Sequence, residues 1–236
     1  MTLRAPVGLL AEGDRVLPGS LRHYLVTVRR LRAGDVFVAF DPVEGTECDA
    51  VLLSEAGGVR CGPVRAGRDA GALIWVQALG KGGKNDAVVQ DATELGATGV
   101  YLAPSARSVA RPQQDRWTAR QERWQRIAQE AARQSGRAKA PLVRTFATWT
   151  EAIEAVEATV ERTCLHPGGS FPLFPLLMGA GALAFAVGPE GGLTDDEVRG
   201  AEERGWKVVS LGPFALRTET VASAVLGAVL VLRGIS

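Results

Sequence analysis

The feature that most constrains the fold of this chain is an alternation of short apolar runs with helical patterns beyond residue 72. The apolar runs predict strands at 73–79, 99–102, 142–146, 163–165, 183–187 and 208–211. Segments with helical spacing predict helices at 85–95, 115–135, 148–160, 195–204 and 219–232, and residues 167–182 have the composition of a loop. Such alternation favours an α/β fold, in which helices cover both faces of a parallel sheet.

The first 68 residues have a different pattern. Short apolar runs at 36–40 and 49–53 are followed by Gly- and Pro-containing turns, which is typical of a small β-barrel. Leucine and valine at three- and four-residue spacing predict a short helix at 20–31. Because residues 65–71 resemble a linker, we predict two domains, at 1–68 and 72–236.

Positive charge is concentrated in one segment. The chain carries a formal net charge of +1, but residues 111–139 hold eight Lys or Arg and three Asp or Glu, a local charge of +5 (8 − 3). This segment is consistent with a footprint for an anionic polymer and equally with a solvated helix face. Trp117 and Trp124 recur there at helical spacing, which favours a buried Trp face over rings that stack on bases.

Other bulk features concern the compartment. Cys48, Cys61 and Cys164 are widely spaced, which is typical of a reducing cytoplasm. The longest apolar stretch, at 221–232, is twelve residues and is interrupted by Ser223, whereas a membrane span needs about 20. We therefore expect a cytoplasmic protein without a membrane partner.

Several catalytic motifs are missing from the sequence. His23 and His166 are the two histidines, and there is no Gly-x-Ser-x-Gly elbow, no metal-binding cluster and no Gly-x-Gly-x-x-Gly after a strand. These absences argue against a hydrolase triad, a metal site and a nicotinamide-dependent oxidoreductase. Residues 80–84, which read Gly-Lys-Gly-Gly-Lys, lack the spacing of a phosphate loop, so we interpret them as a strand-to-helix turn with Lys81 and Lys84 as candidate phosphate contacts.

Two segments have the pattern of a ligand site. The apolar run 183–187 leads into Gly188-Pro189-Glu190-Gly191-Gly192, and Thr194 with Glu197 forms a capping box at the start of the next helix. The cap explains the helix start but not the glycines, which allow a ligand to approach the backbone at the carboxyl end of a strand. A ligand loop is therefore expected at 188–192.

The second segment, 208–220, has the same strand, loop and helix order. Thr218 and Thr220 are both candidate N-caps for the last helix. Arg217 lies near that helix N-terminus, where the dipole disfavours a cation by about 0.3–1 kcal/mol, so a functional role is expected. The structural alternative for Arg217 is a salt bridge to Glu190 or Glu219.

Taken in order, these motifs resemble the SPOUT class of methyltransferases, and within it the family that methylates N3 of a uridine in small-subunit ribosomal RNA. The resemblance covers nearly the whole chain. Its signatures are Thr93-Glu94-Leu95-Gly96 with Pro104 and Arg107-Ser108, residues 122–137 with Pro141, the loop 188–192, and Leu211-Gly212 with residues 216–220. The β-rich start with Leu31-Arg32-Ala33-Gly34-Asp35 is similar to the family's PUA-like RNA-binding barrel.

The resemblance implies S-adenosyl-L-methionine as methyl donor, a deep trefoil knot near the C-terminus, a homodimer, and small-subunit ribosomal RNA or the 30S particle as partner. Carried over by motif, the expected donor-binding residues are Leu165, His166, Val187, Gly188, Pro189, Glu190, Gly191, Leu211, Gly212, Leu216 and Thr220. The expected catalytic residues are Arg217, Glu219 and Glu190. The expected RNA-binding residues are Arg22, Arg29, Arg30, Lys81, Arg107, Arg123, Arg133 and Arg137.

The chain departs from the family pattern at three positions. Pro167 stands where the family has Glu after the His of the first loop, Asp91 stands where it has Lys, and Tyr24 interrupts a stretch usually rich in His and Leu. Two other functions remain open from the residues alone. One is a SPOUT enzyme that methylates the ribose 2′-O of RNA, and the other is an RNA-binding or ribosome-assembly protein with a degenerate donor pocket.

Overall fold

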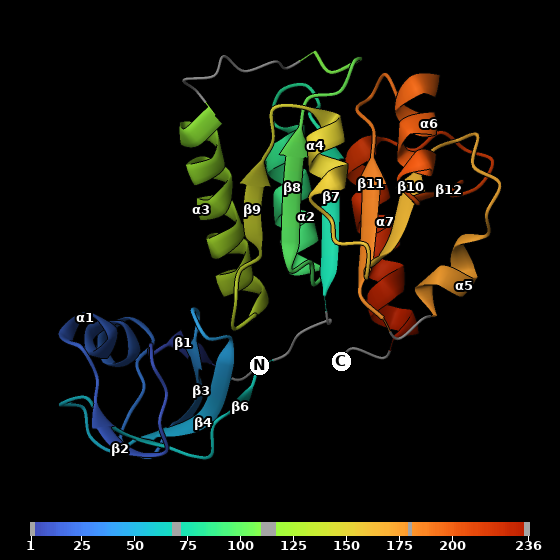
Figure 1. Ribbon diagram of the computed structural model, residues 1–236. Helices are drawn as coiled ribbons and strands as arrows, with labels where there is room; N and C mark the ends of the chain where they lie inside the picture. Colours follow the sequence, from blue (N-terminus) through green and yellow to red (C-terminus); the bar gives the residue numbers. More distant parts are fainter. Residues whose placement is uncertain (1–2, 68–71, 110–116, 179–180, 234–236) are drawn as a thin grey trace. The chain divides into compact units, whose positions relative to one another are not determined.

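The computed structural model describes residues 3–67, 72–109, 117–178 and 181–233. The chain divides into two compact units, which are described separately (Figure 1). One comprises Met1–Asp69 with Ala132–Ala140, and the other comprises Ala70–Ala131 with Pro141–Ser236.

The first unit is built on a six-stranded sheet. Its strands are β1 (Arg4–Pro6), β2 (Gly13–Val16), β3 (Val36–Asp41), β4 (Thr46–Leu52), β5 (Gly58–Cys61) and β6 (Arg65–Ala66). The order is β1-β3-β4-β5-β2, with β6 paired to β4, and every pair except the parallel β1–β3 is antiparallel. Alternate strand residues such as Phe37, Leu52 and Val59 form the core together with Leu25.

The helix predicted at 20–31 differs in kind and length. The chain forms one α-helical turn, α1 (Gly19–Arg22), and continues as the π-helix η1 (His23–Val28). The helix ends before residue 31 because Arg30 has a φ of 60°, a left-handed conformation that no helical residue adopts.

The second unit contains a six-stranded parallel sheet. Its strands are β7 (Leu73–Ala78), β8 (Gly99–Ala103), β9 (Leu142–Thr145), β10 (Glu161–Leu165), β11 (Leu183–Val187) and β12 (Lys207–Val209), in the order β12-β10-β11-β7-β8-β9. The predicted α/β sheet is confirmed. Strand order reverses between β7 and β11, and open α/β sheets bind ligands outside the carboxyl ends of strands at such a point.

Helices cover both faces of this sheet. They are α2 (Lys84–Glu94), α3 (Trp117–Ser135), α4 (Trp149–Glu154), α5 (Leu173–Leu177), α6 (Asp195–Glu203) and α7 (Thr218–Leu232). One core joins α2, α3, α5 and α7 to strand residues such as Trp75 and Phe185, and the other joins α4 and α6 to Val76 and Ala184. Figure 1 shows α2 and α7 behind the sheet and α4 and α6 in front of it.

Several predicted segments of this unit differ from the structure. The helix predicted at 148–160 ends at Glu154, and turns at 155–160 bring Val156 and Val160 into the second core. The segment 167–182, predicted as a loop, contains α5, whose Leu177 packs into the first core. The strand predicted at 208–211 ends at Val209, since Ser210 and Leu211 turn away to line a cavity. Residues 115–116 of the predicted basic helix lie outside the described residues.

Gly169 lies directly against the backbone of Val209. The backbone N–H of His166 donates to the carbonyl of Val209 at 2.9 Å, and Phe171 forms an isolated parallel bridge with Val209. A Cβ at residue 169 would lie 2.3 Å from the carbonyl carbon of Val209, so glycine alone fits there. The trefoil knot implied by the resemblance stays a prediction.

No helix among the described residues is long and apolar enough to cross a membrane. Within the same residues, no group of three or more His, Cys, Asp or Glu side chains is arranged to hold a metal ion.

Candidate functional site

A cavity of about 690 Å³ lies at the carboxyl ends of β10, β11 and β12. The loops that follow these strands line it, together with Lys84 of α2 and the first turn of α7. The structure brings together most of the residues predicted for donor binding, namely Leu165, His166, Val187, Gly188, Pro189, Glu190, Leu211, Gly212 and Leu216. Arg217 also lines the cavity, whereas Gly191, Glu219 and Thr220 are not among its lining residues.

The loop at 188–192 is held in a tight conformation. The N–H of Gly192 donates to the carbonyl of Pro189 at 2.8 Å, and Gly192 has a φ of 71°. A Cβ on the buried Gly188 would lie 3.0 Å from the backbone nitrogen of Leu193, so a side chain there would require the tight loop to shift. Two of the loop residues that line the cavity, Gly188 and Gly192, have no side chain and present backbone alone.

Two contacts anchor the far end of this loop. The predicted capping box is confirmed, since Thr194 and Glu197 exchange side-chain and backbone hydrogen bonds at the start of α6. The guanidinium of Arg107 donates to the carbonyls of Gly191 at 3.0 Å and Leu193 at 3.2 Å. Arg107, predicted to bind RNA, therefore supports the loop in this structure.

A cation bridges two acidic side chains beside the cavity. The Lys84 ammonium lies 2.9 Å from Glu190 Oε1 and 3.9 Å from Glu219 Oε2. The backbone N–H of Lys81 also donates to Glu190 Oε1, at 3.0 Å. Sequence reasoning proposed Lys84 only as a phosphate contact, because its pairing with residues far along the chain leaves no local signal.

These contacts set the ionisation of Glu190. Partial burial acts to raise the pKa of its carboxyl, but hydrogen bonds from Lys84 and from backbone amides outweigh burial, so the pKa lies below its ordinary value. Glu190 therefore remains an anion at neutral pH. It lies within the loop at 188–192, which is predicted to hold the donor.

Arg217 is exposed at the N-cap position of α7. Within the described part of the chain, its guanidinium forms neither a hydrogen bond nor an ion pair, so the salt bridge to Glu190 or Glu219 is not formed. The predicted capping by Thr218 or Thr220 was wrong, because the helix begins at Thr218 and its N-cap residue, Arg217, forms no side-chain capping hydrogen bond. The cavity wall therefore includes a cationic side chain, that of Arg217, which forms no ion pair with the described residues.

Instead of capping, Thr218 takes part in a buried polar network. Its hydroxyl donates to the carbonyl of Gly188 at 3.1 Å and accepts from Gln77 Nε2 at 2.9 Å. Gln77 also accepts from the indole N–H of Trp75, at 3.1 Å. Gln77 is fully buried near the end of β7. Sequence reasoning missed Gln77, because a single polar residue in an apolar strand does not indicate which residues it will contact.

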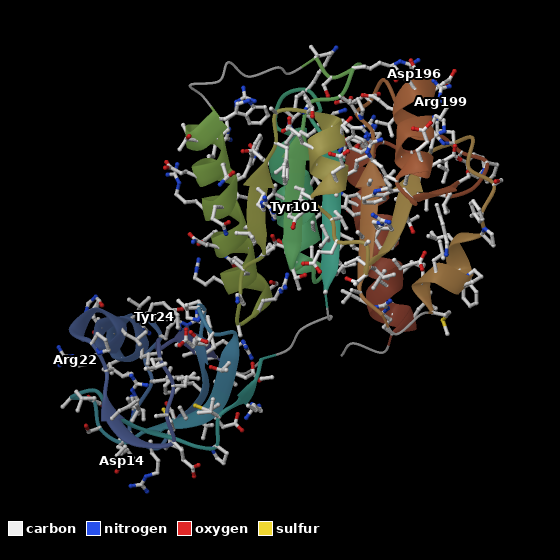
Figure 2. The ribbon with its side chains drawn as sticks, in the orientation of Figure 1. Asp14, Arg22, Tyr24, Tyr101, Asp196 and Arg199 are labelled. Carbon is white, nitrogen blue, oxygen red and sulfur yellow. The ribbon has the colours of Figure 1, made fainter. Side chains whose placement is uncertain are left out.

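The predicted RNA-binding residues are distributed over the chain. Arg22, Arg29 and Arg30 are exposed around α1 and η1 in the first unit, where Figure 2 labels Arg22 and Tyr24. Lys81 is exposed at the turn before α2, and Arg123 on α3 pairs with Asp86 at 2.5 Å. The two remaining residues lie near the end of α3, Arg133 exposed and Arg137 half-buried.

Comparison with known proteins agrees with this geometry. Residues 69–230 match the RNA methyltransferase domain family, and residues 17–58 match the RNA methyltransferase PUA domain family. The chain is 33% identical to the ribosomal RNA small subunit methyltransferase E of Mycobacterium bovis, covering 92% of this chain and 86% of that protein. Identity to the protein of the same name from Bacillus subtilis is 29%, over 90% of this chain and 88% of the relative.

A solved structure extends this likeness to the fold. The chain resembles the crystal structure of a ribosomal RNA small subunit methyltransferase E from Neisseria gonorrhoeae bound to S-adenosyl methionine, with a TM-score of 0.76 and 26% identity. The superposition covers 98% of this chain and 97% of that one. With its PUA domain, its α/β sheet and the loops around its cavity, this chain belongs to the ribosomal RNA small subunit methyltransferase E family of RNA methyltransferases.

Proposed function

We propose that this protein transfers a methyl group from S-adenosyl-L-methionine to N3 of a uridine in small-subunit (16S) ribosomal RNA. The observation that carries the proposal is the cavity at the ends of β10, β11 and β12, formed by the three loops in which the SPOUT resemblance expects the donor. Membership of the family, and its likeness to a relative solved with the donor, support the same reading.

The residues around the cavity fit this donor. A volume of about 690 Å³ suits a ligand of nucleoside size. Leu165, Val187, Leu211 and Leu216 offer apolar walls for an adenine ring, and the glycine-rich loop offers backbone groups for hydrogen bonds. Glu190 supplies a carboxylate at the lining that favours a positively charged ligand.

When bound, the donor supplies an electrophilic methyl group that a nitrogen lone pair attacks in line with the departing sulfur. The chain's own groups align the acceptor and manage charge. Uridine N3 must lose its proton to solvent, which leaves negative charge on the base. In this proposal Arg217, which lines the cavity and forms no hydrogen bond or ion pair among the described residues, stabilises that anion, and Glu190 or Glu219 orients the base.

Recognition of the RNA is assigned to basic residues on both units. We propose that residues 1–68 form an RNA-binding domain and 72–236 the methyltransferase domain. Arg22, Arg29, Arg30, Lys81 and Arg123 would contact phosphates, which makes affinity for RNA fall with salt. N3 of uridine is reachable only in an unstacked base, so the target lies in an irregular or single-stranded region. We further propose a homodimer that acts in the cytoplasm on the 30S particle.

The test is an in vitro methylation assay with small-subunit particles and with their naked RNA, followed by digestion and mass identification of the nucleoside. The proposal expects 3-methyluridine at one site, and loss of the product with Arg217→Ala. Arg199→Ala is the matched control, because Arg199 is an exposed arginine on α6 that pairs with Asp196 outside the cavity (Figure 2). A product methylated at the ribose 2′-O, or no product despite donor binding, would overturn the proposal.

A further inference from the structure

We infer that Gln77 is a positioning residue that fixes the loop at 188–192 and the first turn of α7 to each other around the cavity. The inference rests on the proposed function, because the cavity is taken as the donor site. It concerns a residue on β7 that lies outside the cavity lining and acts through Thr218 and Gly188.

The hydrogen bonds around Gln77 form a chain with one direction. The indole N–H of Trp75 donates to Gln77 Oε1, Gln77 Nε2 donates to the hydroxyl of Thr218, and that hydroxyl donates to the carbonyl of Gly188. Gln77 Nε2 also donates to the carbonyl of Ala78 at 2.9 Å. Every donor among these hydrogen-bonded groups has an acceptor, so no donor of the network is left without a partner.

The direction of these hydrogen bonds also fixes the orientation of the Gln77 side-chain amide. If the amide of Gln77 were flipped, its NH₂ group would face the indole N–H of Trp75. Its oxygen would then face the carbonyl of Ala78, and both contacts would be repulsive. Only one orientation satisfies all partners, and in that orientation the hydroxyl proton of Thr218 must point to Gly188. The network therefore specifies a single geometry.

The network joins three elements beside the cavity. Gln77 is the last but one residue of β7, Gly188 begins the loop after β11, and Thr218 is the first residue of α7. Gly188 and Thr218 both line the cavity, and Arg217 immediately precedes Thr218. Because α7 has no side-chain cap at Arg217, the bond from Thr218 to Gly188 ties the start of the helix to the loop. The network thereby fixes the position of the loop at 188–192 relative to Arg217, the residue proposed to act on the acceptor base.

Packing alone does not require glutamine at this position. Leu73 and Trp75 on the same face of β7, and Leu79 just after the strand, all lie in the apolar core of the unit. A leucine would extend that core, whereas a buried amide stabilises the fold only if each of its hydrogen bonds is formed. A polar network in this place, beside a ligand cavity, fits a role in setting the geometry of the site.

The test measures binding of S-adenosylmethionine and of S-adenosylhomocysteine by calorimetry, on the full chain. Thr218→Val removes the hydroxyl of the network and Gln77→Leu removes its amide, whereas Thr218→Ser keeps the hydroxyl. Thr163→Val is the matched control, because Thr163 is a fully buried threonine of β10 whose hydroxyl has no partner among the described residues. Thermal unfolding of every variant separates loss of the fold from loss of the site.

Thr218→Val and Gln77→Leu are each expected to weaken donor affinity about tenfold, the range for an unmade buried hydrogen bond. The double variant should weaken donor affinity less than the product of the two effects, because both act on one network. Thr218→Ser and Thr163→Val should stay within about twofold of the wild type. Donor affinity unchanged in Thr218→Val, or weakened equally in Thr163→Val, would overturn the inference.

The two proposals fail in different ways. A wild-type protein that binds both compounds but does not methylate small-subunit RNA contradicts the proposed function and leaves the role of Gln77 standing. A protein that methylates the RNA, and whose Thr218→Val variant binds the donor normally, contradicts the role of Gln77 alone. A wild-type protein that binds neither compound contradicts both.

Discussion

The ammonium of Lys84, in the first turn of α2, lies 2.9 Å from Oε1 of Glu190 in the loop after β11. The two residues are far apart in the sequence, and both side chains are about one-third exposed, at 34% and 30%. The pair therefore links α2 to the loop at 188–192 of the candidate donor site.

Lys84→Met should destabilise the protein by about 1 kcal/mol near neutral pH, since the pair is partly screened by solvent. The pKa of Glu190 is lower in the folded chain than its ordinary value of 4.5. Its contribution to stability is therefore complete above that value and is lost as pH falls through the folded pKa. Urea unfolding of wild type and variant across the acid range should show the difference in unfolding free energy shrinking.

Lys207→Met provides the control, because Lys207 forms a more exposed pair with Glu161 at 2.8 Å. A Lys84→Met difference that stays constant down to strongly acidic pH would contradict the assignment of the effect to Glu190.

Arg217→Ala should lower the methylation rate about a hundredfold, the range for loss of one group that stabilises charge in a transition state. Affinity for the donor should change by less than about threefold, because the guanidinium forms no contact that shapes the loops of the described chain. Single-turnover kinetics and calorimetry measure the two quantities. Full turnover with intact donor binding would show that Arg217 has no catalytic role.

Gly169→Ala should destabilise the protein by about 1–3 kcal/mol and abolish donor binding, because the added Cβ would overlap the backbone of Val209 and displace β12. Gly200→Ala is the matched control. Its added Cβ meets only the flexible end of Arg204, at 3.6 Å, within helix α6, and alanine favours a helix over glycine by about 0.5–1 kcal/mol. Thermal unfolding measures the stability of both variants. A Gly169→Ala protein as stable as the wild type would contradict the close approach of Gly169 to the backbone of Val209.

Arg107→Ala distinguishes two roles for one side chain. If Arg107 supports the loop, as its bonds to Gly191 and Leu193 indicate, donor affinity should fall about threefold to tenfold. If Arg107 instead contacts RNA, donor affinity should hold and the dependence of RNA affinity on salt should weaken. Calorimetry with the donor and RNA binding at several salt concentrations separate these results.

Arg29→Ala combined with Arg22→Ala should weaken RNA binding without affecting donor affinity, and it should reduce the slope of log affinity against log salt by about two. Arg15→Ala serves as the control in the same unit, since its guanidinium donates to the carbonyl of Leu9. An unchanged slope would remove Arg22 and Arg29 from the RNA footprint.

Local patterns predicted much of the second unit correctly. The run 183–187 became β11, and Thr194 with Glu197 became a capping box, because both depend on residues close in sequence. The helix predicted at 148–160 failed because tertiary packing of Val156 and Val160 overrode helical spacing. The π-helix at His23–Val28 has no recognised sequence signal.

The candidate site was predictable in outline only. Glycine-rich loops after apolar runs indicated where the cavity would lie, since the carboxyl ends of parallel strands share one edge. The partners of Gln77 and Lys84 were not predictable, because strand order decides them. β7 lies next to β11, and α2 packs against α7, although long stretches of chain separate each pair.

The same strand order has a consequence for synthesis of the chain on the ribosome. Strands β7, β8 and β9 emerge in sequence and can pair as they appear, but the open edge of β7 is covered only when β11 has been made. Until then the nascent sheet exposes the unpaired backbone groups of β7, which is the kind of edge that invites association with other chains. The donor cavity cannot exist before β12 and the first turn of α7 have been made, so the nascent chain cannot bind its donor until that helix has begun to form.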